Sequence, residues 1–279
     1  MVRGLPLIKE PASTCECCIL GKQHRESFPK GFSYRAKKPL ELVHTDLCGP
    51  MRTQSIGGSC YFLTFIDDYS RKTWVYFLKQ KSKIFAKFKE FKVLVENEID
   101  RQIKVLRSDH GGEYDSKAFH EYCKQHGIRR QFTTRYTPQQ NGVAERKNRT
   151  IMNMTRSMLK ARHLSNEYWA EAVACAVYVI NRSPTKSVMN RVPEEAWSGM
   201  SCSVSHFRVF GCVAYAHVPK QIRGKLDDQS EKCIFTGYSE QSKAYKLYNP
   251  VTKKTIISRD VVFKEQESWN GTVEFFFDS

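Results

Sequence analysis

The sequence predicts a mixed α/β domain followed by a small all-β module. Between residues 39 and 200, strand-like and helix-like segments follow the order β-β-β-α-β-α-β-α, which is typical of an α/β layout. From Phe207 onward, the segments become short strand-like runs separated by turn residues. Hydrophobic residues make up 41% of the 279 residues, and this content favours a folded chain over a disordered one.

Periodicity and chain breakers define the elements of the α/β part. Apolar residues from Ile84 to Val95 recur at helical spacing, which predicts a helix over residues 83–99. Residues 72–78 alternate only weakly and are typical of a strand buried on both faces. The other expected strands are residues 41–47, 60–67, 103–109 and 128–133, and the other expected helices are residues 116–126, residues 164–181 and a long helix that Pro138 opens.

The all-β part is built from short runs with turn residues between them. The expected strands are residues 207–215, 233–238, 245–250 and 255–263. We therefore divide the chain into an N-terminal cysteine-containing segment and linker, an α/β core, a β module and an unstructured tail. These four parts are residues 1–38, 39–200, 201–265 and 266–279.

Composition narrows the functional classes. A formal net charge of +16 predicts binding of a polyanion, above all nucleic acid, because Lys and Arg beside phosphates release counterions. No run of about 18 apolar residues appears, so we expect no membrane-spanning helix. The first ten residues do not have the pattern of a signal peptide. Ten cysteines without a regular framework indicate a reducing compartment, the cytosol or the nucleus.

Three acidic residues occupy positions typical of a metal-dependent active site. Asp46 lies in a strand-like run that Gly49-Pro50 stops. Asp109 ends another such run, and 35 residues separate it from Glu145 near the start of the long helix. Carboxylates placed in this way can converge on hard divalent cations, Mg²⁺ or Mn²⁺, which prefer oxygen ligands. Two such ions, held about 4 Å apart, activate the attacking oxygen and stabilise the leaving oxygen in phosphodiester chemistry.

The long helix also carries a basic stripe. At about 100° per residue, Glu145 heads one face of this helix. The same face carries Arg149, Asn153, Arg156 and Lys160. Neutral amides at the head of the helix suit contact with DNA, as do polar residues along its substrate side. The expected DNA contacts are Gln139, Gln140, Asn141, Asn148, Arg149, Arg156 and Lys160. The alternative for this pattern alone is a solvated face on an ordinary core helix.

A second acid pair, Asp67 and Asp68, lies at another strand end. Paired acids in a hairpin more often accept hydrogen bonds from following N–H groups than bind a metal. We therefore interpret Asp67 and Asp68 as structural residues of a turn.

Four motifs of this chain resemble the integrase of copia-type long-terminal-repeat retrotransposons. They are His44–Pro50, Phe65–Arg71, Arg107–Tyr114 and Thr137–Arg149, and the similarity extends from about Cys15 to about Glu265. The resemblance implies an RNase H-like catalytic core followed by an SH3-like module. It also implies that Asp46, Asp109 and Glu145 bind the metals, because their spacing matches the D,D(35)E pattern of that family.

The resemblance further implies the reaction and the partners. The expected activity is that of a polynucleotidyl transferase, which joins the 3′ ends of element DNA to target DNA with Mg²⁺ or Mn²⁺. The expected partners are element DNA, target DNA and further copies of this chain, with no membrane and no small-molecule substrate. The expected locations are a cytoplasmic virus-like particle and the nucleus. Two alternatives stay open: a metal-dependent nuclease of RNase H-like fold, and a catalytically silent relic that binds nucleic acid.

The N-terminal segment departs from the family pattern. Cys15 and Cys18 have the C-x2-C spacing of half a zinc site. In the family, two histidines further upstream complete the site, but this chain has no histidine before His24. We therefore expect residues 1–38 to be a truncated zinc-module remnant, with Zn²⁺ bound only in a full-length polyprotein.

Overall fold

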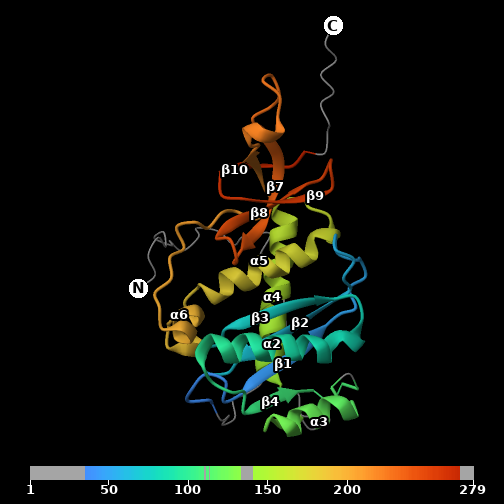
Figure 1. The fold of residues 1–279 in the computed structure, drawn as a ribbon, viewed down its shortest axis with the longest axis vertical. Coiled ribbons are helices and arrows are strands. Elements are labelled where there is room, and N and C mark those ends of the chain that lie inside the picture. Colours follow the sequence, from blue (N-terminus) through green and yellow to red (C-terminus); the bar gives the residue numbers. More distant parts are fainter. Residues whose placement is uncertain (1–34, 110, 113, 133–140, 271–279) are drawn as a thin grey trace. The chain divides into compact units, whose positions relative to one another are not determined.

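The computed structural model describes residues 35–109, 111–112, 114–132 and 141–270, and it shows two compact units (Figure 1). The first unit holds the residues up to Ser157 together with Asn166–His206. The second unit holds Met158–Ser165 together with the residues from Phe207 onward. The boundary between the units therefore cuts through one helix.

The first unit is built on a mixed sheet of five strands in the order β3-β2-β1-β4-β5. The chain first makes an antiparallel meander, and β1 then pairs in parallel with β4, as β4 does with β5. The strands are β1 (Val43–Cys48), β2 (Tyr61–Asp67), β3 (Thr73–Leu78), β4 (Val105–Ser108) and β5 (Arg129–Phe132). All five lie within the expected ranges to within a residue, and the predicted mixed α/β class is confirmed.

Helices α2 (Ile84–Ile99) and α3 (Lys117–Gln125) cover one face of this sheet with aromatic side chains. Phe65 of β2 stacks on Phe91 of α2 at 4.2 Å between ring centroids, and Phe88 of α2 stacks on Phe119 of α3 at 5.0 Å. These side chains are fully buried and form the main core. The N-terminus of α3 is capped by Ser116, whose side chain accepts a hydrogen bond from the Phe119 N–H.

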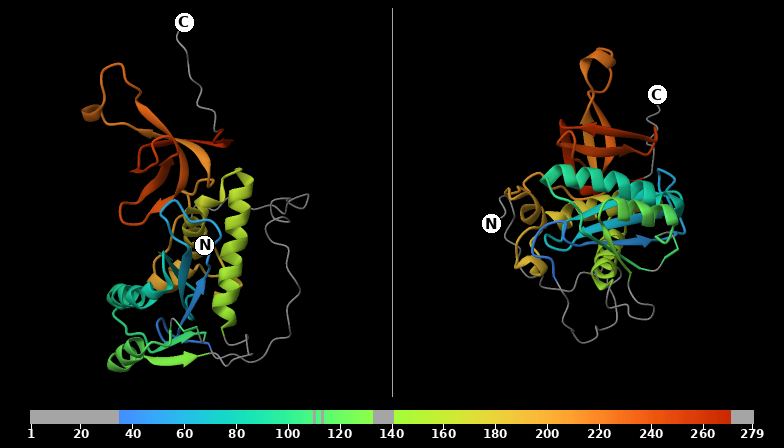
Figure 2. Two further views of the ribbon diagram at one scale, coloured as in Figure 1. Left: turned by 90° about the vertical axis from the view of Figure 1, so that its right-hand side faces the viewer. Right: turned by 60° about the horizontal axis from the view of Figure 1, so that its bottom comes forward.

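Helix α4 (Gly142–Ala161) lies on the opposite face of the sheet from α2 (Figure 2). Ala144 and Ile151 are its fully buried apolar residues on this side. Helix α5 (Trp169–Asn181) covers the same face, because Trp169 contacts the rings of Phe62 and Phe77. The short helix α6 (Pro193–Ser198) returns to the edge of the sheet, where Trp197 packs on Trp74 of β3. The strand ends are thus placed beside the first turns of α4.

The second unit is a sheet of five antiparallel strands in the order β10-β6-β7-β8-β9. The strands are β6 (Cys212–His217), β7 (Ser230–Ser239), β8 (Ala244–Asn249), β9 (Lys254–Ser258) and β10 (Val261–Ser268). Small side chains of β6 and Phe235 of β7 form its core. The end of α4 and the turn after it belong to this unit, and Arg162 of that turn donates a hydrogen bond of 2.6 Å to the backbone carbonyl of Glu265.

The structure differs from the expected β module at three places. The first is the strand expected over residues 207–215, which begins only at Cys212, as β6. The single strand expected over residues 255–263 is two strands, β9 and β10, because the chain turns at Asp260, whose N–H bonds the Ser258 hydroxyl at 3.2 Å. The last strand continues to Ser268, beyond the expected start of the tail at Gln266. In the described ranges, no helix is both long enough and apolar enough to cross a membrane.

Candidate active site at the ends of β1 and β4

Asp46 lies on β1, on the sheet face that α4 covers. The antiparallel register places Asp46 opposite Thr64 of β2. Its carboxylate is half-buried, and the Asn148 amide of α4 donates a hydrogen bond of 2.9 Å to Oδ2. The residue is therefore held between a strand and a helix rather than in a loop.

Asp109 follows β4 directly, beside Asp46. The parallel register pairs Val43 with Leu106 and His44 with Arg107, and continuing it places Asp109 next to Asp46. The Asp109 carboxylate accepts a hydrogen bond of 3.2 Å from the Gly111 N–H, which fixes it at the start of the following turn. Asp46 within β1 and Asp109 directly after β4 thus supply two neighbouring carboxylates, although β1 continues for two residues beyond Asp46.

Glu145 lies in the first turn of α4, and its side chain is exposed. Its N–H bonds the carbonyl of Asn141 at 3.1 Å, so the helical hydrogen bonding begins just before this residue. The Glu145 carboxylate is close enough to raise the pKa of Asp46. The charges of Asp109 and Glu145 therefore both act on Asp46.

The pKa of Asp46 is raised to about 7. Burial is the largest cause, the negative charge of Asp109 is the next, and the charge of Glu145 adds to both. The hydrogen bond from Asn148 acts in the opposite direction. No cation balances the Asp46 carboxylate among the described residues, so a positive ion at this place would relieve a real electrostatic cost.

The oxygen-only donor set fits a hard divalent cation in its chemistry. The three carboxylates lie farther apart than the ligands of an assembled metal site. Within the described ranges, no group of three or more His, Cys, Asp or Glu side chains is gathered closely enough to hold a metal ion. Asp46 and Asp109 are held by hydrogen bonds, whereas Glu145 is exposed on a flexible stem. Convergence of the acids on a cation would therefore require Glu145 to turn inward.

Asn148 differs from its expected place among the DNA contacts. It is buried, and its amide joins Asp46 to Thr64, whose hydroxyl donates a 2.9 Å hydrogen bond to Asn148 Oδ1. Asn148 lies about 300° around the helix from Glu145, which turns it toward the sheet. Its spacing from Glu145 was visible in the sequence, but its two bonding partners were not.

The other expected DNA contacts fall into three groups. Arg149, Arg156 and Lys160 are exposed on α4, as expected of a solvent-facing stripe, and Lys160 belongs to the second unit. Asn141 is 1% exposed, and neither atom of its amide has a partner among the described residues, so it is not presented at the surface. The remaining expected contacts, Gln139 and Gln140, and the zinc half-site, Cys15 and Cys18, lie outside the described residues.

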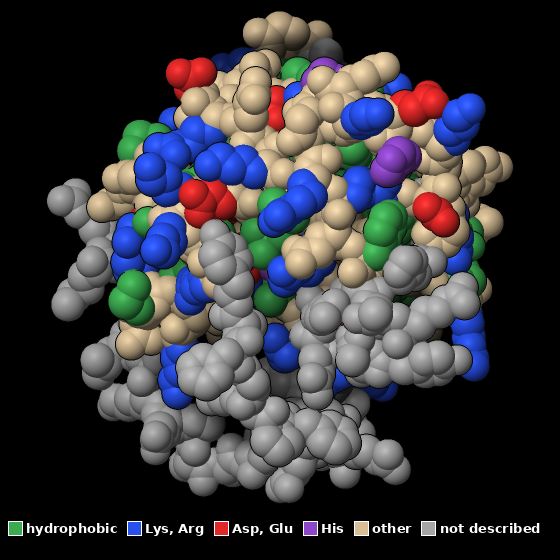
Figure 3. All heavy atoms as spheres, turned by 90° about the horizontal axis from the view of Figure 1, so that it is seen from below, with side chains coloured by type: hydrophobic (Ala, Val, Ile, Leu, Met, Phe, Trp, Pro, Cys, Tyr) green, Lys and Arg blue, Asp and Glu red, His purple; other side chains and the backbone are tan. Residues whose placement is uncertain are grey.

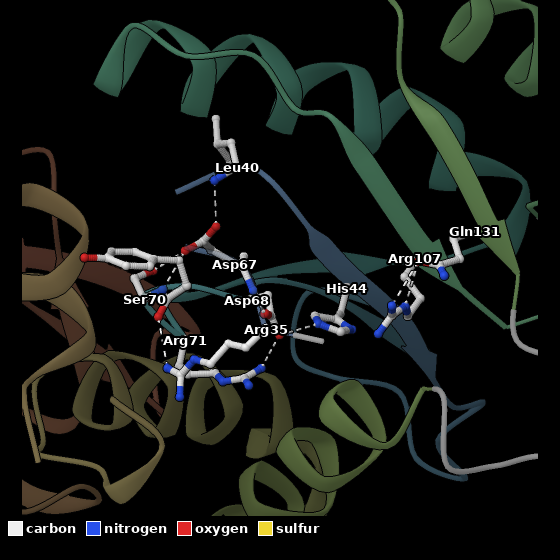
Figure 4. A network of polar contacts seen from close by, with 11 residues as sticks. Arg35, Leu40, His44, Asp67, Asp68, Ser70, Arg71, Arg107 and Gln131 are labelled. Atoms are coloured by element: carbon white, nitrogen blue, oxygen red, sulfur yellow. Dashed lines mark hydrogen bonds and ion pairs between the residues drawn. The ribbon is translucent and has the colours of Figure 1, made fainter. Parts of the chain in front are cut away.

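Sequence reasoning missed a buried polar network around Asp68, which includes His44, two residues before Asp46 on β1 (Figure 4). His44 Nε2 lies 2.9 Å from Asp68 Oδ1, and Arg71 donates a 2.8 Å hydrogen bond to the same oxygen. Burial lowers the pKa of His44, so the imidazole is neutral near pH 7. Burial alone raises the pKa of Asp68, but the His44 hydrogen bond and the Arg71 charge outweigh burial and lower it to about 2. The sequence signal that could have indicated this network is the position of His44, two residues before Asp46 and therefore on the same face of the strand.

The interpretation of the Asp67–Asp68 pair as structural residues of a turn is confirmed for Asp67, whereas Asp68 bonds His44, Arg71 and the Ala36 N–H instead. Asp67 Oδ2 accepts hydrogen bonds of 2.7 Å from both the N–H and the hydroxyl of Ser70. Its other oxygen accepts a 2.8 Å bond from the Leu40 N–H. Asp67 thus closes the β2–β3 hairpin and connects it to the backbone at Leu40, just before β1.

Two family matches cover most of the described chain. Residues 36–138 match the family described as integrase core domain, and residues 212–275 match the retroviral polymerase SH3-like domain. The chain therefore carries an integrase core domain followed by a retroviral polymerase SH3-like domain. The matched part of the integrase core includes Asp46 and Asp109 and ends before Glu145.

Curated relatives place this integrase region in longer proteins. The chain is 54% identical over 253 residues to a retrovirus-related Pol polyprotein from transposon TNT 1-94 of Nicotiana tabacum. It is 36% identical over 254 residues to one from transposon RE2 of Arabidopsis thaliana. Each match covers 91% of this chain but only 19% and 17% of the respective polyprotein. The chain thus spans about a fifth of the length of the curated relatives that it matches.

A solved structure agrees with the fold. The simian T-cell lymphotropic virus intasome in complex with PP2A regulatory subunit B56 gamma contains a similar chain, with a TM-score of 0.51. The match covers 88% of this chain and 84% of that one, at 13% sequence identity. At this identity the match supports the fold and nothing further. The predicted RNase H-like core followed by an SH3-like module is confirmed.

Proposed function

We propose that this integrase region, of the copia type, catalyses metal-dependent strand transfer, which joins 3′ ends of element DNA to target DNA. The observation that carries the proposal is the placement of Asp46 on β1, Asp109 after β4 and Glu145 on α4, where the charges of Asp109 and Glu145 both act on Asp46. Three acids from β1, β4 and α4, without a balancing cation among the described side chains, form an oxygen donor set for divalent metal.

Each carboxylate has a definite task in the proposed reaction. Asp46 and Asp109 would hold one Mg²⁺ or Mn²⁺, and Asp46 with Glu145 would hold the other. Bound there, the two ions would activate the attacking 3′ hydroxyl and stabilise the leaving oxygen of the target phosphodiester. Asn148 keeps the Asp46 carboxylate in a fixed orientation between strand and helix. The transfer is a direct in-line displacement, so the protein needs no nucleophile of its own.

The exposed cations of α4 would hold the DNA. Arg149 and Arg156 lie on the solvent side of the helix, and with the exposed Lys160 they would contact backbone phosphates. Lys and Arg side chains predominate over Asp and Glu on the face of the protein shown in Figure 3. The net charge of +16 supports strong, salt-dependent binding. Because two DNA ends must be joined together, we propose a homo-oligomer as the active form.

A strand-transfer assay tests the proposal. Oligonucleotides that carry the element ends are incubated with the protein and Mg²⁺ or Mn²⁺, in parallel with Glu145→Gln. We expect joined products for the unmodified protein, none for the variant, and none when EDTA removes the metal. DNA binding should be nearly equal in both proteins, because one exposed carboxylate is neutralised and no phosphate contact is lost.

Two other results would overturn strand transfer and point to the alternatives. Metal-dependent cleavage without joining would indicate a nuclease that uses water as the attacking group. DNA binding with neither cleavage nor joining, equal in the unmodified protein and in Glu145→Gln, would indicate a silent relic.

A further inference from the structure

A pocket of about 410 Å³ lies in the first unit, on the side of α4 turned away from Glu145. Its walls come from four segments: the β2–β3 turn, the first two thirds of α4, the end of α5 and the loop that follows α5. On α4, the lining includes Val143, Lys147 and Met154. Since each residue turns a helix by about 100°, Lys147 lies about 160° around α4 from Glu145. The pocket is therefore separate from the carboxylate cluster.

The lining is positively charged. It includes Arg71, Arg146 and Lys147 and contains neither Asp nor Glu. Arg71 is paired with Asp68 at 2.8 Å. Among the described residues, the side chains of Arg146 and Lys147 have neither an ion-pair partner nor a hydrogen-bond acceptor. Two uncompensated cations that share one hollow repel each other, and an anion placed between them would remove that repulsion.

The opposite wall is suited to a phosphate ester rather than to a bare ion. Thr185 and Ser187 bring hydroxyl groups to it, and the Thr185 oxygen already accepts a 3.4 Å hydrogen bond from the Ser187 N–H. Met154 and Ile180 add apolar surface. A volume of about 410 Å³ falls within the usual range for ligand pockets, about 300–1,000 Å³, and exceeds what a single phosphate fills. Cations beside apolar surface match a phosphate with its attached sugar and base.

We propose that this pocket binds a backbone phosphate, with its nucleotide, of a nucleic-acid strand that runs on the side of α4 opposite the carboxylates. This inference rests on the proposed function, because it takes nucleic acid as the substrate. Arg146 and Lys147 bind the phosphate oxygens, and Met154 with Ile180 contacts the sugar or base. One helix thus holds nucleic acid on two sides, through Arg149 and Arg156 on one and through the pocket on the other.

Lysine footprinting on the unmodified protein tests the pocket directly. The protein is acetylated alone, with a DNA duplex, and with inorganic phosphate, and the modification of Lys147 is measured by mass spectrometry. Lys117 of α3, which is exposed and does not line the pocket, is the internal control. We expect the duplex to decrease acetylation of Lys147 several-fold and to leave Lys117 unchanged. Inorganic phosphate should protect Lys147 more weakly.

Salt-dependent affinity supplies the second measurement. Each lost phosphate contact lowers the slope of log K against log salt by about 0.9 in duplex DNA. Arg146→Gln/Lys147→Gln should therefore lower the slope by about 1 to 2 and weaken binding about tenfold at low salt. Lys117→Gln/Lys124→Gln removes the same charge from exposed positions on α3 and should leave the slope unchanged.

Three results would overturn the proposal. If the duplex binds but Lys147 stays reactive and the slope of the double variant is unchanged, the pocket does not hold nucleic acid, while the proposed function stands. If inorganic phosphate protects Lys147 and the duplex does not, the pocket serves a small phosphorylated ligand instead. If the unmodified protein binds no duplex at all, the proposed function fails together with this inference.

Discussion

Asn148 joins Asp46 to Thr64 through two hydrogen bonds of 2.9 Å each, one given by its amide nitrogen and one received by its amide oxygen. It lies three positions after Glu145 on the same helix. One buried amide therefore bridges the sheet that carries Asp46 and the helix that carries Glu145. A hydrophobic residue could fill the same volume but could not orient the carboxylate.

Replacing Asn148 should thus affect catalysis and stability together. Asn148→Ala leaves the Thr64 hydroxyl and the Asp46 carboxylate without their buried partner, and we expect a loss of about 1–3 kcal/mol in the free energy of unfolding. Strand transfer should fall far more than DNA binding. Urea denaturation, strand-transfer rates and DNA affinity measure the three effects. Asn153→Ala, on the same helix with its side chain bonded to Arg156, is the matched control and should change each of them little.

The raised pKa of Asp46 predicts a pH-dependent stability. Its folded pKa of about 7 lies above the ordinary value of 3.8, so the folded state favours the protonated acid. The stabilisation is complete below about pH 4 and is lost as the pH rises through about 7. The Asp46→Asn variant has no titrating carboxyl group at this position and therefore lacks this pH dependence. Its stability relative to the unmodified protein should increase by up to about 4 kcal/mol between pH 4 and pH 8.

Urea denaturation at pH 4 and pH 8 without divalent metal measures this difference. Asp115→Asn, which removes an exposed carboxylate, is the reference and should show no such increase. Equal stability differences at the two pH values for Asp46→Asn would contradict the predicted shift.

The Asp68 network predicts the opposite dependence on pH. The folded pKa of Asp68, about 2, lies below 3.8, so its ionised form stabilises the fold. This contribution, about 2 kcal/mol, is present above about pH 4 and is lost as the pH falls toward 2. Asp68→Ala should also leave Arg71 without its buried partner and cost about 3–5 kcal/mol near pH 7. Acid and urea unfolding curves test both statements, and an acid midpoint unaltered by the substitution would refute the first.

From the contacts of Arg162 we predict that the stability of the second unit depends on the segment at the end of α4. Its guanidinium donates to the Glu265 carbonyl at 2.6 Å, and its stem lies against Gly211, where a Cβ would come within 2.9 Å of it. Arg162→Ala should destabilise β10 and β6 by about 1–3 kcal/mol, because the Glu265 carbonyl loses a charged donor. Hydrogen exchange of the β6 and β10 amides measures this. Lys160→Ala, an exposed neighbour, should leave those amides as protected as before.

The sequence was sufficient for the elements of the core and for the placing of Asp46 and Asp109. Both acids lie at the end of β-rich runs that glycine-containing turns stop, and parallel pairing of β1 with β4 brings such ends together. The sequence was not sufficient to predict the hydrogen-bond partners of Asn148 and His44. Helical and strand periodicity tell which face a side chain takes, but the partner across the interface depends on how α4 is placed on the sheet.

The second unit shows the same limit. The change to short strands after Phe207 was enough to expect an all-β module. The turn that separates β9 from β10 carries no Gly or Pro, only Arg259 and Asp260, so the two strands read as one. The sequence also did not show that Met158–Ser165 belong to this unit, because the amphipathic pattern of α4 continues into these residues without a break.

The division of α4 between two units has a consequence for how such genes recombine. A crossover anywhere between codons 166 and 206 would keep the β module with its own strands but exchange the segment directly after α4 that carries Arg162 and Leu164. Gly211 requires the small gap that those side chains leave. Exchange of the module between diverged elements would therefore succeed only when the end of α4 travels with it, or when both parents carry matching residues there. The inherited block is discontinuous in the gene.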